Sequence, residues 1–224
     1  MIFLRALGAL LTYPDREFVA ALPEIAGAVE EAAPVPRATR QRLAALVDEL
    51  RRGDRYEIEE RYVALFDRGR ATSLHLFEHV HGDSRERGQA LVDHARVYER
   101  AGLRLAPGEL PDYLPALLEY LSCRSAAEAR EMLGDCAHVL RAVGGRLAGR
   151  GSGYAAVFDA LLAIAGERGL DWPETTAPAE PEPALDAEWM DAPAFGPGSE
   201  RNAGAQPATA VMRLVPREKN GFRR

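Results

Sequence analysis

Apolar residues recur at helical spacing along most of the chain, at intervals of three and four positions. Stretches of strict alternation rich in β-branched residues are missing, so no sheet is predicted. Breakers and capping residues interrupt the helical pattern, as at Tyr13-Pro14-Asp15, Gly82-Asp83-Ser84 and Pro107-Gly108. The apolar runs predict about eight helices, over roughly 4–11, 18–29, 43–50, 58–66, 91–98, 114–121, 132–143 and 157–164.

The helical pattern stops after Trp172. The remaining 52 residues hold eight of the 15 prolines and few large apolar residues, a composition typical of disordered segments. We therefore expect two parts: a single-domain helical bundle over residues 1–172, and a Pro/Ala/Glu-rich, flexible tail over 173–224. Trp189, Met190 and Phe195 in the tail are either a docking segment or hydrophobic residues without a partner.

Composition narrows the class of protein. The chain has 224 residues, of which 47% are hydrophobic, enough for a sizeable core. Its net charge of −6 argues against nucleic-acid binding, which needs a basic surface. No uncharged apolar run is long enough to span a membrane, and the N-terminal run lacks the features of a signal peptide. Two cysteines are too few for a disulfide framework. We expect a soluble, cytoplasmic protein.

Polar and aromatic residues crowd into the run from 62 to 102, which holds four of the five histidines. The run is predicted to form two amphipathic helices hinged at Gly82-Asp83. On a helix, His75 and His79 share a face, a geometry that zinc sites use. However, Leu76 stands where a zinc protease has its glutamate. Three interpretations remain: a metal site, packing of a helix face, or the polar rim of a binding groove.

Signatures of other enzyme classes are missing. No serine lies in a Gly-x-Ser-x-Gly elbow, and neither cysteine lies in a Cys-x-x-Cys pair. The glycine-rich stretches lack the Gly-Lys-Ser/Thr ending of a phosphate-binding loop. The sequence thus contains no recognised catalytic motif.

The segment from Glu109 to Pro115, ELPDYLP, is the second distinctive feature. Its prolines are typical of the first turn of a helix, and its two acids favour the positive end of the helix dipole. Helix capping alone can explain them. The alternative is that Glu109 and Asp112 form an acidic lip that meets a basic peptide.

Together these segments resemble the NarJ family, cytoplasmic chaperones that help assemble the molybdenum-containing subunit of respiratory nitrate reductase. The family is a branch of the TorD-like maturation proteins of redox enzymes. The resemblance is strongest in FDRGRATSLHLFEHVHGDSRERGQALVD, from Phe66 to Asp93, and in ELPDYLPALLEYLS, from Glu109 to Ser122. Leu11 to Asp15, LTYPD, is a weaker element. The resemblance covers about Leu4 to Leu170, and Glu188 to Phe195 resembles a family feature in altered form.

The resemblance implies an all-helical, TorD/NarJ-like fold and a role that is not enzymatic. Family members bind the N-terminal peptide of the apo catalytic (alpha) subunit, prevent its premature docking to the membrane, and permit insertion of the molybdenum cofactor. The chaperone itself is not expected to retain a cofactor or a metal. We expect a monomer or a weak dimer.

An amphipathic peptide binds by laying its apolar face in a groove between helices. Acidic side chains at the rim would meet basic residues of the client, although arginines of the same run can instead pair with these acids internally. The predicted peptide-binding residues are Tyr62, Phe66, Arg70, Ser73, Leu74, His75, Phe77, Glu78, His79, His81, Asp83, Glu109, Asp112 and Tyr113.

A second function remains open from the residues alone. His75, His79, His81 and Asp83 are the types of side chain that a helical metal-dependent hydrolase would use. Stoichiometric metal in the purified protein would favour this hypothesis over the chaperone.

Overall fold

Ten α-helices account for most of the described residues of this computed structural model, which are 1–32, 35–82, 84–172 and 215–216. The predicted all-helical class is confirmed. The helices are α1 (Ile2–Leu10), α2 (Arg16–Glu30), α3 (Arg37–Arg52), α4 (Arg55–Phe66), α5 (Leu76–His81), α6 (Arg85–Arg100), α7 (Leu114–Ser122), α8 (Ala126–Asp135), α9 (Ala137–Gly149) and α10 (Ala155–Ala165).

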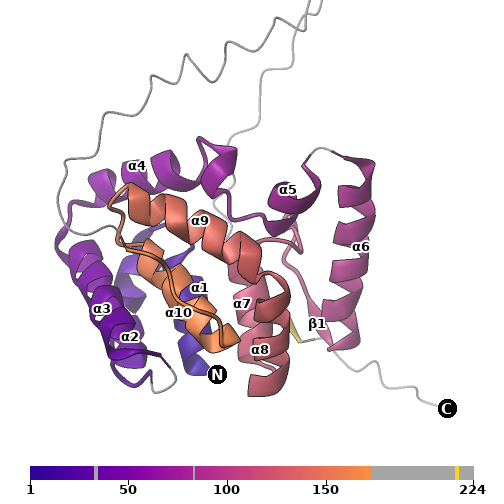
Figure 1. Ribbon diagram of the computed structural model, residues 1–224, viewed down its shortest axis with the longest axis horizontal. Helices are drawn as coiled ribbons and strands as arrows, with labels where there is room; N and C mark the ends of the chain where they lie inside the picture. Colours follow the sequence, from indigo (N-terminus) through magenta and orange to yellow (C-terminus); the bar gives the residue numbers. More distant parts are fainter. Residues whose placement is uncertain (33–34, 83, 173–214, 217–224) are drawn as a thin grey trace, which may run out of the picture.

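Helix α10 lies at the centre of the bundle. Nine of its eleven residues are buried, and it packs against α3, α8 and α9. Helix α1 packs against α2 and α7. Figure 1 shows α5 and α6 as a pair at one side of this body, away from α2 and α3. The segment richest in histidine therefore lies at the edge of the bundle.

Two differences explain why the structure has ten helices where about eight were predicted. The run over 132–143 forms two helices, because the backbone at Cys136 leaves helical geometry (φ −99°, ψ 8°). Gly134 and Asp135 come directly before this break, but apolar residues at helical spacing continue across it, and the sequence pattern was therefore interpreted as one helix. The second difference is α5, a helix of six residues that follows a short 3-10 turn, η1 (Arg70–Thr72).

The prediction of a continuous helix leading to the hinge at Gly82 is wrong. Residues 67–75 are not α-helical, and His75 is the N-cap of α5, with extended backbone angles. His75 instead forms an antiparallel bridge with Tyr113. In this bridge the Leu76 amide donates to the Asp112 carbonyl at 3.0 Å, and the Leu114 amide donates to the Leu74 carbonyl at 2.9 Å. The two segments of strongest family resemblance are thus joined by backbone hydrogen bonds.

A minimal sheet is the exception to the prediction of no strands. Strand β1 (Leu103–Arg104) pairs antiparallel with β2 (Val215–Pro216), two residues on each side. Strand β2 belongs to the predicted tail. The rest of that tail, including Trp189, Met190 and Phe195, lies outside the described residues, so its predicted flexibility and the domain boundary at 172 stay predictions.

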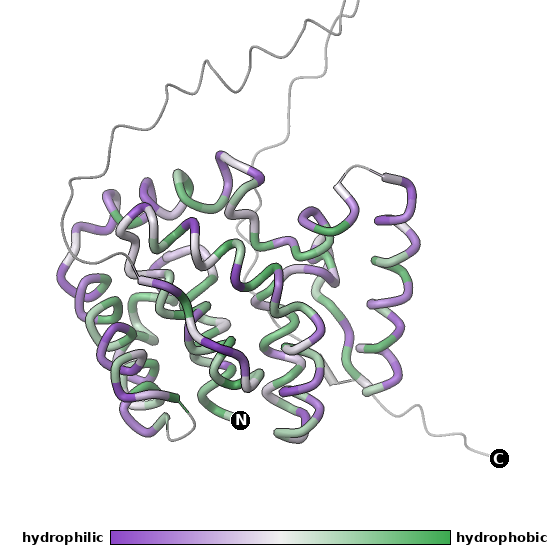
Figure 2. Tube along the Cα trace, viewed as in Figure 1, coloured by the Kyte–Doolittle hydropathy of each residue, from purple (hydrophilic) through white to green (hydrophobic). Residues whose placement is uncertain are grey.

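Among the described residues, none of the helices combines the length and the apolar character that crossing a membrane requires. Helix α6 has hydrophilic and hydrophobic residues alternating along its turns (Figure 2). Tyr98 is its one buried residue. Helix α6 is therefore covered by the body much less completely than the other long helices.

Candidate functional site

Asp112 lies at the centre of the predicted site, in the loop before α7. Its side chain has no exposed surface. Its carboxylate accepts a hydrogen bond from the Phe77 amide at 3.3 Å and lies 3.2 Å from Nδ1 of His75. Arg87 of α6 approaches the same carboxylate at 3.6 Å. One buried acid therefore connects the start of α5, the loop before α7, and α6.

The surroundings of Asp112 keep it charged. Burial alone would raise the pKa of this carboxyl group, but the hydrogen bond and charge of His75 lower it, and so do Arg87 and the Phe77 amide. The net effect is a pKa below the usual value of Asp. A buried charge that is held ionised in this way acts as a structural anchor.

A second set of polar contacts holds α5 against its neighbours. The Ser73 hydroxyl donates to Glu78 at 2.6 Å, and Arg87 pairs with the other oxygen of Glu78 at 3.1 Å. Nε2 of His79 donates to the Ser73 carbonyl at 2.8 Å. The pairing of Arg87 with the predicted acids, one of the two alternatives for the arginines, is confirmed. Glu78 and Asp112 are consequently occupied within the chain.

Helix α6 is anchored to the body by Tyr98. The Tyr98 hydroxyl donates to the Pro111 carbonyl at 2.8 Å and lies 3.1 Å from Nε2 of His94. Because the hydroxyl proton is used for Pro111, Nε2 of His94 carries a proton and donates to the Tyr98 oxygen. Burial lowers the pKa of His94, an effect that the charge of Asp112 partly offsets. His94 is therefore neutral at physiological pH.

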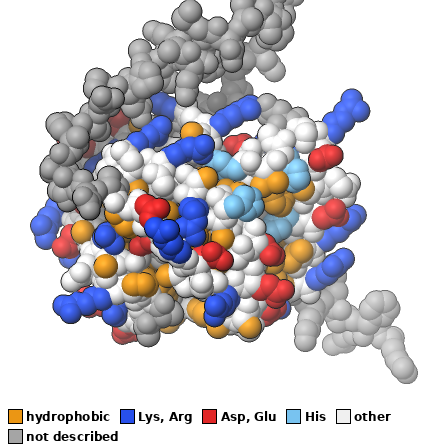
Figure 3. All heavy atoms as spheres, viewed as in Figure 1, with side chains coloured by type: hydrophobic (Ala, Val, Ile, Leu, Met, Phe, Trp, Pro, Cys, Tyr) orange, Lys and Arg blue, Asp and Glu red, His pale blue; other side chains and the backbone are white. Residues whose placement is uncertain are grey.

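A half-covered apolar surface lies between α5 and α6, and we call it the Phe77 patch. The Phe77 ring meets His81 at 5.8 Å and His94 at 5.4 Å between ring centroids, both edge to face. Leu91 and Val97 are half-buried and lie one helical turn before and after His94 on α6, and Val80 is 52% exposed. Figure 3 shows histidine side chains gathered around hydrophobic ones on this part of the molecule.

A row of aromatic rings starts at His75, the N-cap of α5. The rings of His75 and Tyr113 are 5.2 Å apart, and those of Tyr13 and Tyr62 are 5.7 Å apart. The Tyr62 hydroxyl donates to the Leu11 carbonyl at 2.8 Å and lies 3.5 Å from the Tyr113 hydroxyl, which joins the two pairs. Tyr62 is buried, whereas Tyr13, His75 and Tyr113 keep exposed surface.

Two carboxylates flank these rings. Burial raises the pKa of Asp67 and that of Glu109, and the neighbouring His75 partly offsets both effects. Burial also raises the pKa of Tyr113 to about 12, and the negative charges of Glu109 and Asp67 contribute to the rise. Both acids therefore lie close to the His75–Tyr113 pair.

Several predicted groove residues prove to be interior. Tyr62, Phe66 and Leu74 are 3%, 5% and 4% exposed and belong to the main core, so the prediction that they line an open groove is wrong. The prediction that Asp112 forms part of an acidic lip is also wrong, because its side chain has no exposed surface. These residues and the buried Ser73 support the site from beneath.

The other predicted residues remain at the surface or partly so. They are Arg70, His75, Phe77, Glu78, His79, His81, Glu109 and Tyr113. Asp83 lies outside the described residues. The prediction missed Leu91, His94 and Val97 on α6 and Asp67 at the end of α4. Residues 87, 91, 94 and 98 are three or four positions apart, so the sequence alone places them on one face of α6. This spacing could have identified the face.

The described residues do not favour a metal site. Among them, no group of three or more histidine, cysteine or acidic side chains is placed to hold an ion. His75 and His79 are directed to Asp112 and to the Ser73 carbonyl, respectively. The helical i, i+4 geometry that motivated the metal hypothesis does not occur, because His75 precedes the helix.

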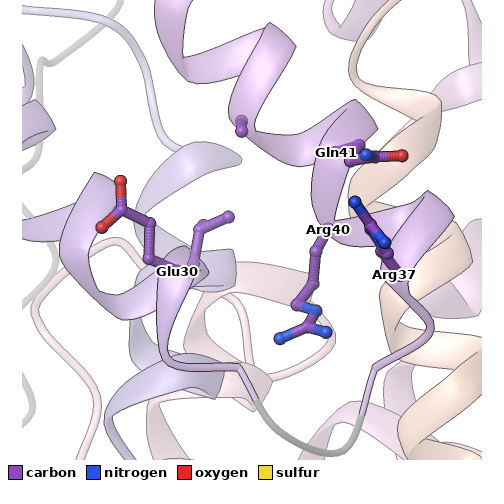
Figure 4. Close-up of a pocket in the computed structure, with 6 residues that line it drawn as sticks. Glu30, Arg37, Arg40 and Gln41 are labelled. Carbon is purple, nitrogen blue, oxygen red and sulfur yellow. The ribbon is translucent and has the colours of Figure 1, made fainter.

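Two hollows differ in their relation to the site. One, of about 260 Å³, lies beside α5, and its lining residues are Asp67, Arg68, Gly69, Arg70, Ser73 and Glu78. The other, of about 290 Å³, lies between α2 and α3, where Arg40 extends into the space opposite the helix that carries Glu30 (Figure 4). The second hollow contains no predicted site residue.

The chain is similar in sequence to a known protein family. The family model described as nitrate reductase delta subunit matches residues 32–160. The Escherichia coli K12 nitrate reductase molybdenum cofactor assembly chaperone NarJ is 44% identical over 165 residues, which are 74% of this chain and 70% of the relative. The probable chaperone NarW of the same organism is 39% identical over 197 residues, 85% of this chain and 82% of the relative. The probable NarJ of Bacillus subtilis is 32% identical over 158 residues, 70% and 85% of the two chains.

Proposed function

Because the chain belongs to the nitrate reductase delta subunit family, we propose that it binds the N-terminal peptide of the apo catalytic subunit of a respiratory nitrate reductase. In this proposal it is an assembly chaperone and not an enzyme. It supports insertion of the molybdenum cofactor before the catalytic subunit docks to the membrane, and it acts in the cytoplasm. Its relatives are named as assembly chaperones for this cofactor, which supports the role.

The Phe77 patch is the observation that carries the proposal. A helix with one buried residue and a half-covered apolar stripe leaves hydrophobic surface that a partner can cover. An amphipathic peptide helix binds such a surface through apolar residues at i, i+3, i+4 and i+7. Phe77, Leu91 and Val97 are the apolar anchors, and His81 and His94 form the polar edge.

The remaining predicted residues have supporting or peripheral roles in this proposal. Tyr62, Phe66, Ser73, Leu74 and Asp112 hold the segment around α5 in place. The exposed or half-exposed residues at its rim contact the client, and they are Arg70, His75, Glu78, His79, Glu109 and Tyr113, together with Asp83. No retained cofactor is required, and the chain functions as a monomer or weak dimer.

The second hypothesis, a metal-dependent hydrolase built on His75, His79, His81 and Asp83, is less well supported. Two of its histidines already have partners that fix their ring nitrogens. In the chaperone proposal the same histidines contact the client peptide, and this role needs no metal.

Titration calorimetry with a peptide that copies the start of the cognate catalytic subunit tests the proposal. We expect Phe77→Ala and Leu91→Ala each to weaken binding at least tenfold, because each removes an apolar anchor. Val92→Ala is the matched control, since Val92 lies on the same helix but is 49% exposed and off the stripe. Melting temperatures would verify that each variant is folded. Equal affinity for all four proteins, or no binding by the unmodified chain, would contradict the proposal.

A further inference from the structure

The aromatic row at the N-terminal end of α5 has no role in the binding of an apolar peptide face. It comprises the exposed or half-exposed rings of Tyr13, His75 and Tyr113, with Asp67 and Glu109 beside them. Tyr13 comes from the LTYPD element, which the proposed function leaves unexplained. The contacts around the Leu11 carbonyl bring this element together with Tyr62 and Tyr113.

We propose that this surface, which we call the Tyr113 face, receives a basic side chain of the client's N-terminal peptide. The inference rests on the proposed function and adds to it the chemistry of the residue that is recognised. An arginine or lysine of the peptide lies against the rings of Tyr13 and Tyr113 and between the carboxylates of Asp67 and Glu109.

Asp67 and Glu109 carry negative charges that no arginine of the described residues neutralises. In the described part of the chain, the positive neighbour of both Asp67 and Glu109 is the imidazole of His75, and neither acid faces an arginine there. Glu78 and Asp112, by contrast, are already paired with Arg87. Glu109 is half-buried and Asp67 is exposed, and a carboxylate without an arginine partner is stabilised when a positive charge arrives. These two acids are therefore the ones that can still attract a cation.

The aromatic rings beside these acids can also attract a cation. The face of a tyrosine ring attracts an ammonium or guanidinium group, and the attraction grows when water is excluded. The His75 and Tyr113 rings are tilted by only 31° relative to each other, so they form a shallow wall with a common orientation. The adjacent hollow offers no comparable site, because Arg68 and Arg70 line it together with Asp67. A basic side chain is thus expected at the rings and not in the hollow.

One peptide helix is long enough to contact both the Phe77 patch and the Tyr113 face. A helix of six residues is about 9 Å long, whereas a peptide helix of 12 to 15 residues is about 18 to 22 Å long. The Tyr113 face begins at His75, the N-cap of α5, and the Phe77 patch extends to His81, the last residue of α5. The same peptide can place its apolar face on one and a basic residue on the other.

A double-mutant experiment tests the inference. The two peptides are the cognate N-terminal sequence and the same sequence with each Arg and Lys replaced by Gln. The two proteins are the unmodified chain and the Asp67→Asn/Glu109→Gln variant. We expect the variant to bind the native peptide about tenfold more weakly, and to bind the neutral peptide with the same affinity as the unmodified chain does.

Matched controls separate recognition from general effects of charge. Asp93→Asn/Glu99→Gln removes two exposed acids of α6 and should leave both affinities unchanged. Tyr13→Leu should weaken the native peptide several-fold while Tyr13→Phe, which keeps the ring, should not. An equal loss for both peptides, or no loss while the native peptide still binds, would overturn the inference alone. If neither peptide binds the unmodified chain, both the proposed function and the inference are overturned.

Discussion

Nδ1 of His75 lies 3.2 Å from Oδ1 of Asp112, and the acid of this pair has no exposed side-chain surface. The contact joins two segments that are 37 residues apart in the sequence. It fixes the residue that precedes α5, while the Phe77 amide fixes the first turn of α5 against the same carboxylate. The orientation of the Phe77 patch therefore depends on Asp112.

Asp112→Asn should destabilise the protein by about 1–3 kcal/mol at pH 7, because buried donors lose a charged acceptor. The pKa of Asp112 is lowered in the folded state, so its contribution is present above the unfolded pKa of about 3.9. The contribution is lost as pH falls through the folded-state pKa. Urea unfolding at pH 7 and pH 3 should show that the difference in the free energy of unfolding between the unmodified protein and Asp112→Asn shrinks in acid.

The control is Asp48→Asn, which changes an exposed acid in surface ion pairs and should have little effect. Equal losses of stability for the two variants would contradict the anchor role.

The helices were predictable because their signal is local. Periodic apolar positions identify each amphipathic segment without knowledge of its neighbours, and the buried faces of α1, α2 and α3 follow that pattern. The break at Cys136 was missed because apolar residues at helical spacing continue across it, although Gly134 lies two residues before it. The extended backbone of His75 was also missed, because it results from the bridge to the distant Tyr113.

The segments of the candidate site could be selected from the sequence, but the surface that they form could not. Tyr62 and Phe66 resemble groove residues in the sequence, but both are covered by contacts with Tyr154, far along the chain. Whether an aromatic residue faces solvent depends on such tertiary contacts, which a single sequence does not reveal. Asp67 was missed for the same reason, because nothing in its local sequence places it beside Tyr113.

His94→Gln should remove part of the acid sensitivity of the fold. The pKa of His94 is lowered by burial, so its neutral form stabilises the native state above the unfolded pKa of about 6.5. That stability is lost as pH falls below this value, because the unfolded chain binds the proton more readily. The free energy of unfolding, measured at pH 7.5 and pH 5, should fall less in His94→Gln than in the unmodified protein. The exposed His138 provides the control: His138→Gln should leave the pH dependence unchanged, and identical behaviour of both variants would refute the assignment.

Arg87→Met should loosen α6. The guanidinium group pairs with Glu78 and Asp112 and is 20% exposed, so its removal leaves two acids without their cation. The expected loss is about 1–3 kcal/mol. Hydrogen exchange of the α6 amides should accelerate more than that of the α10 amides. Arg96→Met breaks an exposed pair with Asp93 on the same helix and should cost no more than about 0.5 kcal/mol. Uniform acceleration across the chain would argue against a local clamp.

Asp67→Asn and Glu109→Gln should raise stability while they weaken binding of the client. Burial raises the pKa of both acids, so each contributes most favourably below its unfolded pKa, and that advantage is lost as pH rises through the folded-state pKa. At pH 7 neither charge faces an arginine, and an uncharged amide avoids the cost of removing the charge from water, chiefly at the half-buried Glu109. Thermal melting should therefore give a higher midpoint for the double variant at pH 7 and a difference close to zero at pH 3.5, where the wild-type groups are largely protonated. Asp93→Asn/Glu99→Gln should not show this pattern. A lower midpoint for Asp67→Asn/Glu109→Gln at pH 7 would mean that these acids stabilise the fold, and their place at a binding surface would lose its main support.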